Sequence, residues 1–197
     1  MAPYAYPEPN STLISSLALQ PHPEGGYFAE TVRTKETTPS PFADGAERSL
    51  ATEIYYLLTP DSARGRMHMN KSITFHLHHQ GRALYTLVKP TPPGSSEAPQ
   101  IKRVVMGTDS AKGEVRQLLV EGGWWKASEI PDEDLAGSEN EKDARIGCLI
   151  SEVVVPGFHW QDHAFLTEQG LIDLFHGDAS SEGVKQLLPY VKREEKN

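Results

Sequence analysis

Short strand-like runs that end at turn residues constrain the fold of this chain more than any other feature. Each run is rich in β-branched, aromatic or other apolar residues and stops at Pro, Gly or a polar cluster. The runs expected to form strands are residues 54–58, 73–78, 83–89, 101–106, 115–120, 148–155 and 159–165. Many are separated by the roughly 8–12 residues that are typical of sandwiches and barrels. Because no βαβ alternation is present, we predict an all-β double-sheet barrel or jelly roll, whose interior can hold a small ligand.

Helical patterns are confined to the two ends of the chain. After Ser11, a good N-cap residue, apolar residues between positions 13 and 19 predict one short amphipathic helix. Residues 168–174 and 181–191 show helical patterns near the C-terminus. The expected parts of the chain are a flexible arm at residues 1–10, a single domain at residues 11–178 and a helical tail at residues 179–197.

Charge and cysteine content narrow the classes of function. The 197 residues carry 19 Lys and Arg against 27 Asp and Glu, and this net charge of −8 without a basic run argues against nucleic acid and membrane as partners. The single cysteine, Cys148, lies in an apolar run, as expected for a buried thiol in a reducing compartment. Residues 1–10 lack the apolar core of a signal peptide, and no apolar run approaches the ~20 residues of a membrane span. We therefore expect a soluble, cytoplasmic protein.

The stretch from Pro21 to Thr31, PHPEGGYFAET, combines a turn with the start of a strand. Gly25 and Gly26 can adopt positive φ and so allow a sharp turn into the strand. The residues that follow alternate aromatic bulk with an acid, as a strand with one polar face does.

This stretch, together with residues 49–60, 67–81, 113–127 and the segment ISEVVVPGF at 150–158, resembles the fungal branch of the DUF985 family of cupins. The resemblance covers residues 11–178. It implies a cupin double-stranded β-helix (jelly roll) with short terminal helices, which binds a small molecule and is usually a homodimer. The element Gly-Tyr-Phe-x-Glu-Thr also resembles the corresponding strand of dTDP-sugar 3,5-epimerases, which are metal-free cupins.

The resemblance also bears on metal binding. Metal-binding cupins supply His-x-His, a Glu a few residues later and a third His on a later strand. Here the pair reads His68-Met69-Asn70, residues 72–74 hold no Glu, and Lys126 stands about where the third His falls. A cationic Lys is a poor ligand. The resemblance thus implies that the ordinary cupin metal site is lost, and we expect no cofactor.

Four histidines fall within 12 residues and are candidates for chemistry. His76 and His78 share one face of a predicted strand with Thr74, whereas His79 points the other way. Imidazoles that face a cavity could exchange protons at a carbon centre, or bind a metal if His68 completes the set. Alternatively, His78 and His79 are exposed turn residues.

Glu53 and Tyr55 share a face of the strand that precedes these histidines. A Glu buried beside apolar walls would have a raised pKa and could act as a base, and a Tyr could donate a proton to a developing enolate. Alternatively, Tyr55 packs in the core and Glu53 pairs with Arg48 or Arg66.

Aromatic and polar residues of the later strands are candidates for ligand contacts. If Trp124 and Trp125 lie on a strand, one of them faces inward and could wall a pocket for a ring. Lys126 could bind an anionic group; core packing and solvent exposure are the alternatives. The predicted ligand-binding residues are Asn70, His78, Tyr85, Trp125 and Lys126.

Three functions follow from these residues. The leading one is a metal-independent isomerase, epimerase or cyclase that acts on a small polar or ring-containing metabolite, with His68, His76, Glu53 and Tyr55 as acid–base groups. The second is a non-catalytic cupin that binds a small molecule. The third is a metal-dependent cupin oxygenase that uses His68, His76 and His78.

Overall fold

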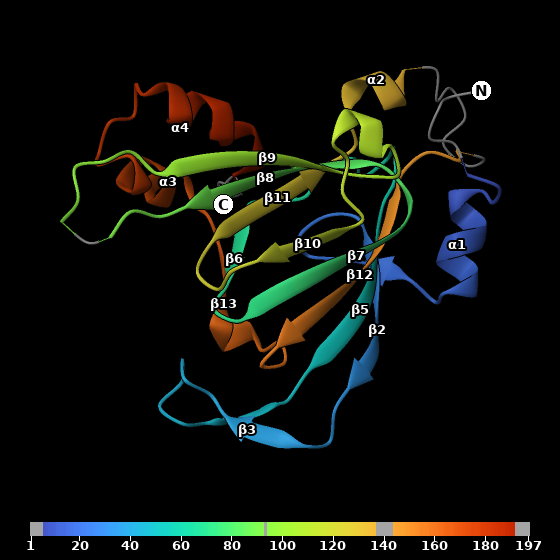
Figure 1. The fold of residues 1–197 in the computed structure, drawn as a ribbon, viewed down its shortest axis with the longest axis horizontal. Helices are drawn as coiled ribbons and strands as arrows, with labels where there is room; N and C mark the ends of the chain where they lie inside the picture. Colours follow the sequence, from blue (N-terminus) through green and yellow to red (C-terminus); the bar gives the residue numbers. More distant parts are fainter. Residues whose placement is uncertain (1–5, 93, 137–143, 192–197) are drawn as a thin grey trace, which may run out of the picture.

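Two antiparallel sheets form the body of the protein in a computed structural model, which describes residues 6–92, 94–136 and 144–191 (Figure 1). The six-stranded sheet has the order β1 (Gln20–Pro21), β2 (Tyr27–Arg33), β5 (Thr52–Leu58), β12 (Cys148–Val155), β7 (Ile73–Gly81) and β10 (Gln117–Val120). The five-stranded sheet has the order β13 (His163–Phe165), β6 (His68–Asn70), β11 (Trp125–Glu129), β8 (Ala83–Lys89) and β9 (Gln100–Met106). A separate hairpin of β3 (Thr37–Pro39) and β4 (Glu47–Ser49) lies at the lower edge of Figure 1. The predicted all-β jelly roll is confirmed.

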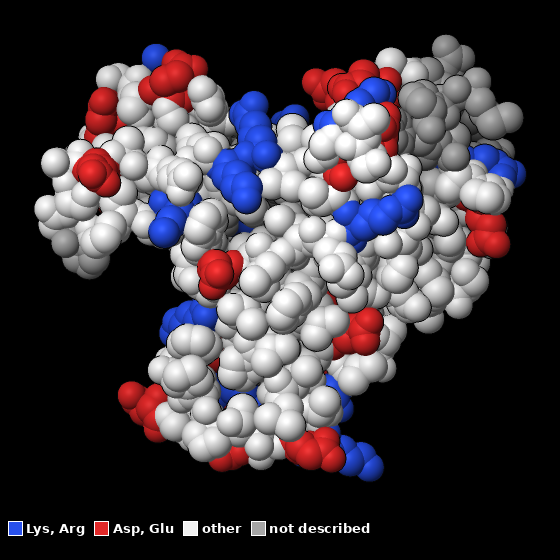
Figure 2. Space-filling model, viewed as in Figure 1, with Lys and Arg blue, Asp and Glu red and all other residues white. Residues whose placement is uncertain are grey.

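The helices of the described residues are short. They are α1 (Asn10–Ser16), α2 (Asp132–Leu135), α3 (Glu168–Leu174) and α4 (Glu182–Leu187), with 3-10 turns η1 (Ser110–Lys112), η3 (Trp160–Asp162) and η4 (Leu188–Tyr190). α1 begins one residue before Ser11, because Pro9 takes the N-cap position. Within the described ranges, no helix has the length and apolar character needed to cross a bilayer. Figure 2 shows Lys and Arg scattered among Asp and Glu, with wide uncharged areas between them.

The main core lies between the two sheets. Apolar side chains of both sheets meet there, and they include Tyr56, Leu58, Tyr85, Leu87, Met106, Leu118 and Ile150. β5 contributes alternate residues to this core, whereas Leu57 points to the opposite face and packs beneath α1 with Leu13 and Leu149. Both faces of β5 are therefore covered by apolar contacts.

The first described residues pack onto the barrel. Tyr6 is buried, its backbone N–H donates to the carbonyl of Arg145, and its hydroxyl donates to the side chain of Asn10. The Asn10 side-chain amide donates to the carbonyl of Ile146 at 3.0 Å. Of the flexible arm predicted at residues 1–10, residues 1–5 lie outside the described ranges and residues 6–10 are held in place.

The C-terminal helices cover a second core on the outer face of the five-stranded sheet. Met67, Val88 and Ala127 of the sheet region contact Leu166 and Leu171, and the cluster is completed by Val184, Leu187, Tyr190 and Val191. The part of the predicted tail that the structure describes, residues 179–191, is thus integral to the packing of the domain; residues 192–197 lie outside the described ranges.

Leu187→Ala is expected to lower the free energy of unfolding by about 3 kcal/mol, because removing a fully buried leucine leaves a cavity that its neighbours fill only in part. Chemical denaturation measures this change. Leu188, which is 44% exposed, supplies the matched control: Leu188→Ala should change the same quantity by less than about 0.5 kcal/mol. Equal effects of the two substitutions would contradict the packing of the tail.

Candidate functional site

A cavity of about 290 Å³ opens between the sheets beside the 158–160 loop. Its walls come from β2, β5, β6 and β12, from the turn before β2 and from that loop. The lining residues are His22, Glu24, Phe28, Glu30, Arg33, Thr52, Ile54, Asn70, Glu152, Val154, Phe158, His159 and Trp160. Apolar and aromatic side chains form most of the wall; His22, Glu24 and Glu152 lie at its buried end, and Glu30, Arg33 and His159 lie at its exposed mouth.

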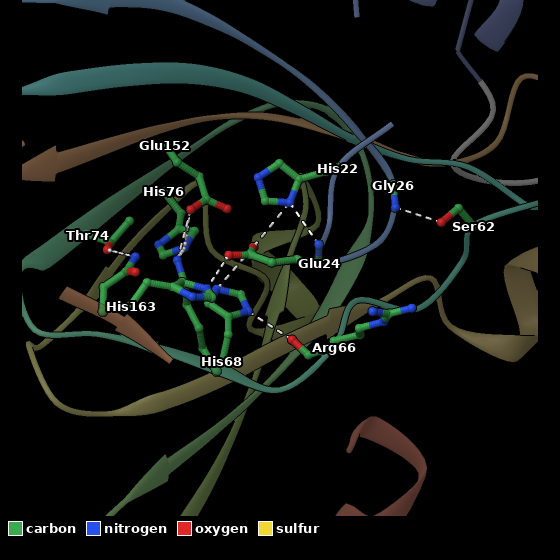
Figure 3. A network of polar contacts seen from close by, with 12 residues as sticks. His22, Glu24, Gly26, Ser62, Arg66, His68, Thr74, His76, Glu152 and His163 are labelled. Carbon is green, nitrogen blue, oxygen red and sulfur yellow. Dashed lines mark hydrogen bonds and ion pairs between the residues drawn. The ribbon is translucent and has the colours of Figure 1, made fainter. Parts of the chain in front are cut away.

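Glu24 is the centre of the first polar group at the buried end (Figure 3). Its Oε1 accepts a hydrogen bond from His163 Nε2 at 2.9 Å, and its Oε2 faces His68 Nε2 at 3.3 Å and His22 Nδ1 at 3.7 Å. Burial alone would raise the pKa of the Glu24 carboxyl, but His68 and the hydrogen bond from His163 outweigh it and hold the pKa at about 2. Glu24 is therefore a carboxylate at neutral pH.

The glycine turn after Glu24 sets the position of this carboxylate. Gly25 and Gly26 have φ of 101° and 69°, and a Cβ on Gly26 would lie 2.6 Å from the carbonyl oxygen of Leu57. The N–H of Gly26 donates to Ser62 Oγ at 2.6 Å. Only glycine allows β2 to begin this close to β5. The backbone of the turn therefore explains why the sequence motif contains these glycines.

His68 presents an unpaired lone pair to Glu24. Its Nδ1 lies 2.8 Å from the carbonyl oxygen of Arg66, which can only accept, so Nδ1 carries the proton. Burial lowers the pKa of His68 to about 4, and the ring is neutral at pH 7. Nε2 therefore has no proton, and it has no hydrogen-bond partner among the described residues. Two acceptor atoms, His68 Nε2 and Glu24 Oε2, thus face each other.

The second polar group is built around the buried ammonium of Lys126. Its Nζ lies 2.8 Å from His76 Nε2 and 2.8 Å from Glu152 Oε2. His76 donates through Nδ1 to the carbonyl of Leu118 at 3.2 Å, so its Nε2 accepts from Lys126. Burial would raise the pKa of Glu152, but Lys126 and His76 hold it well below its usual value. Burial, followed by Lys126, lowers the pKa of His76.

Two tyrosines stand next to this lysine. Burial raises the pKa of Tyr56 and Tyr85 well above the usual value, so both keep their protons, and both hydroxyls interact with Ser128. The ring of Tyr85 meets that of His76 edge-on, with centroids 5.2 Å apart. Both tyrosines, Lys126 and His68 line a second cavity of about 10 Å³, which has room for about one water molecule.

Five of the predicted site residues are brought together. His68, His76 and Lys126 lie in the two polar groups, and Tyr85 lies against His76. Asn70 lines the main cavity and donates through Nδ2 to Thr74 Oγ1 at 3.4 Å. His76 and Thr74 share the inner face of β7, as their spacing predicts.

Glu53 and Tyr55 do not reach the cavity. They lie on the outer face of β5, where Tyr55 packs against the cluster beneath α1 and lies 5.7 Å from the ring of His79. Glu53 does not pair with Arg48, because the Arg48 guanidinium binds Asp162 at 2.7 Å. The placement of Glu53 and Tyr55 at the site is thus corrected. Alternation predicts which residues share a face of the strand, but not which face lines the cavity, because α1 makes the outer face of β5 apolar too.

His78 and Trp125 also lie away from both cavities. His78 donates through Nε2 to the carbonyl of Gly81 at 2.8 Å, near the end of β7 where the register with β12 shifts. Trp125 faces the second core beneath the C-terminal helices, because its neighbour Lys126 takes the inward side of β11. His79 points outward, as expected, and binds Ser151 Oγ at 2.8 Å.

Four of the site residues were not predicted from the sequence: His22, Glu24, Glu152 and His163. Two of them, His22 and Glu24, belong to the PHPEGGYFAET motif, whose local pattern predicts a turn and the start of a strand and gives these two side chains no role. Glu152 is a lone acid in an apolar strand, and such an interruption is itself a signal of a paired, buried charge. His163 follows Asp162 with no local pattern that distinguishes it.

Among the described residues, Glu24, His68 and His163 offer three ligand atoms within 4.8 Å of one another. Two imidazoles and a carboxylate suit Zn²⁺ or Fe²⁺, and the bond from His68 Nδ1–H to a carbonyl is usual for a ligating histidine. These donors therefore fit a metal ion. The set His68, His76 and His78 is not brought together, because His76 accepts from Lys126 and His78 binds Gly81.

Sequence comparison gives matches over most of the chain. A family profile described as "Cupin superfamily (DUF985)" matches residues 11–166. The uncharacterized protein YML079W of Saccharomyces cerevisiae is 41% identical over 172 residues, which are 81% of this chain and 78% of the yeast protein.

Two solved structures superpose on most of this chain. A hypothetical protein from Leishmania major superposes with a TM-score of 0.72 at 27% identity, over 91% of this chain and 98% of its own. Protein SO0799 from Shewanella oneidensis superposes with a TM-score of 0.72 at 19% identity, over 95% of this chain and 100% of its own. The second similarity, at this low identity, concerns the fold alone.

Proposed function

Since the chain belongs to the DUF985 family of the cupin superfamily, we propose that it is an isomerase-, epimerase- or cyclase-like enzyme that moves a proton on a small polar or ring-containing metabolite without a metal. The cavity of about 290 Å³ lies at the lower end of the ~300–1,000 Å³ that small-molecule sites occupy. The substrate is therefore a small metabolite.

One observation carries the proposal: the unprotonated His68 Nε2 faces Glu24 Oε2 at 3.3 Å, and the buried Lys126 lies opposite His68 on the adjacent strand. A proton taken up between these two acceptors would be held by both, because the imidazolium would pair with the carboxylate. Lys126 and His68 line the small cavity, which shares Glu24 and Glu152 with the larger one, so proton acceptor and cation lie side by side where the two cavities adjoin.

These groups are suited to proton transfer next to a carbonyl. His68 would remove the proton as the C–H bond breaks, and the electron pair would move onto the carbonyl oxygen. The Lys126 ammonium, or the hydroxyl of Tyr56 or Tyr85, would stabilise the negative charge that develops on this oxygen. Delivery of a proton to the opposite face of the same carbon would complete an epimerisation, and delivery to a neighbouring carbon would complete an isomerisation. His76 and Glu152 would hold the lysine in place.

A second candidate is a metal-dependent reaction, which the convergence of Glu24, His68 and His163 favours. A transition metal held by these three residues would supply a Lewis acid that polarises a bound carbonyl. We rank it second because Lys126 already places a positive charge beside the same residues.

Solvent isotope exchange tests the proposal without knowledge of the substrate. The protein is incubated with a small-molecule extract of Saccharomyces cerevisiae in D₂O, and mass spectrometry is used to find any metabolite that gains deuterium. We expect a metabolite to gain carbon-bound deuterium. Retention of a metabolite without exchange would instead support a non-catalytic binding protein.

Removal of metal is expected to leave this exchange rate unchanged. The protein is treated with EDTA, its metal content is measured by mass spectrometry, and the exchange is repeated with and without added Zn²⁺ or Fe²⁺. Loss of exchange on chelation, with recovery on metal addition, would contradict the metal-independent proposal and favour the second candidate. The homodimer implied by the family resemblance stays a separate prediction.

A further inference from the structure

Hydrogen-bond acceptors without partners collect at the buried end of the main cavity. The Oδ1 atom of Asn70 is buried and has no partner in the described part of the chain, although the residue is 8% exposed and lines the cavity. Glu152 binds Lys126 and His76 through Oε2, and no described residue bonds to its Oε1 (Figure 3). His68 Nε2, which lies next to Glu24 in the adjoining small cavity, is a third unpaired acceptor. A ligand that satisfies these atoms must bring donors.

The cationic side chains near this cavity are already engaged. Lys126 directs two of its three N–H donors at His76 and Glu152, and the Glu152 carboxylate balances its charge. At the mouth, Arg33 binds both carboxylate oxygens of Glu30, at 2.9 and 2.7 Å, and also donates to the carbonyl of Phe158. An anionic ligand would therefore meet Glu24 and Glu152 without a cation to bind it.

Aromatic rings line the cavity above these acceptors. Phe28 lies on β2, and Phe158 and Trp160 pack edge-to-face with ring centroids 5.0 Å apart. Aromatic faces are electron-rich, so they favour both a ring and a cation. Aromatic walls together with carboxylates form the combination that recognises ammonium groups in proteins.

We propose that the ligand of this cavity is a small ring compound that carries a protonated amine, with the ammonium directed at Glu152 and Asn70 and the ring between the aromatic side chains. This inference rests on the proposed function, because it names the substrate class of the same site. It excludes carboxylates, phosphates and nucleotide sugars as ligands. The ammonium supplies the donors that Glu152 Oε1 and Asn70 Oδ1 lack.

Calorimetry with three probes of nearly equal size tests the charge preference. Benzylamine, benzyl alcohol and benzoate are titrated into the protein at pH 7.5 and low ionic strength. Benzylamine is expected to bind at least about tenfold more tightly than benzyl alcohol, since hydrogen bonds between charged groups are the strong ones. Benzoate is expected not to bind measurably. Comparable or tighter binding of benzyl alcohol or benzoate, or no binding of any probe, would overturn the inference.

Glu152→Gln and Glu53→Gln form a matched pair of variants. Each removes one negative charge from the same sheet, but Glu152 lies in the cavity and Glu53 lies on the outer face. We expect Glu152→Gln to weaken benzylamine binding at least about tenfold and Glu53→Gln to leave it unchanged. Equal affinities in all three proteins would also overturn the inference. If Glu152→Gln does not fold, the three probes on the unmodified protein still decide.

The outcomes separate this inference from the proposed function. Preference for the alcohol or the acid would remove the cationic ligand and leave the proton-transfer proposal intact. Absence of isotope exchange, together with a clear preference for benzylamine, would instead leave a binding protein for amines.

Discussion

His68→Ala is expected to reduce the rate of solvent deuterium exchange by about 10²–10⁴-fold while the protein stays folded. The substitution removes the one imidazole nitrogen that is unprotonated, unpaired among the described residues and adjacent to Glu24. The exchange assay with the yeast extract measures the rate, and thermal unfolding measures the fold.

His79→Ala is the matched control for this substitution. His79 binds Ser151 on the outer face of the six-stranded sheet, so its loss should leave the exchange rate unchanged. A His68→Ala protein that exchanges at the unmodified rate would show that the base lies elsewhere. Equal losses in both variants, with lowered unfolding temperatures, would point to a structural effect.

Lys126→Met is expected to destabilise the fold by about 3–5 kcal/mol, which corresponds to a fall of about 10 °C in Tm for a chain of this size. The substitution keeps most of the side-chain volume but removes the only lysine or arginine that is ion-paired with Glu152 in the described structure. Glu152 is only 8% exposed, so water replaces the ammonium only in part, and a largely buried charge is left without its partner. Calorimetric or denaturant unfolding measures the change.

A second substitution tests whether the unpaired charge is the cause. Lys126→Met combined with Glu152→Gln should recover part of the lost stability, because the double variant no longer buries a carboxylate alone. Lys102→Met, at an exposed position of β9, should change stability by less than about 0.5 kcal/mol. A Lys126→Met protein as stable as Lys102→Met would mean that the buried ion pair contributes nothing.

The strand runs and the glycine turn already determine most of the fold. Runs such as 148–155 and 83–89 coincide with β12 and β8, because short apolar segments bounded by turn residues have few other ways to bury their side chains. The turn at Gly25 and Gly26 is equally local, since its backbone requires glycine. Lys126 and His68, placed by the family resemblance, lie opposite each other in β11 and β6.

The local sequence pattern does not determine which face of a strand points into the barrel. In β5, the residue pairs Glu53 and Tyr55, and Ile54 and Tyr56, alternate as expected, but both faces are covered by apolar groups. Period-two spacing carries no information on which of two buried faces holds the cavity. The placement of Glu53 and Tyr55 therefore depended on α1, which packs from outside the sheet.

The polar groups of the cavity depend on tertiary structure even more than the orientation of the strand faces does. Glu24, His68 and His163 come from the turn before β2, from β6 and from β13, and they meet only when the two sheets close on each other. The sequence by itself determined the jelly roll and named His68, His76 and Lys126. The acids that face these side chains, Glu24 and Glu152, are brought to them by long-range packing, because contacts between distant strands leave no periodic trace in the sequence.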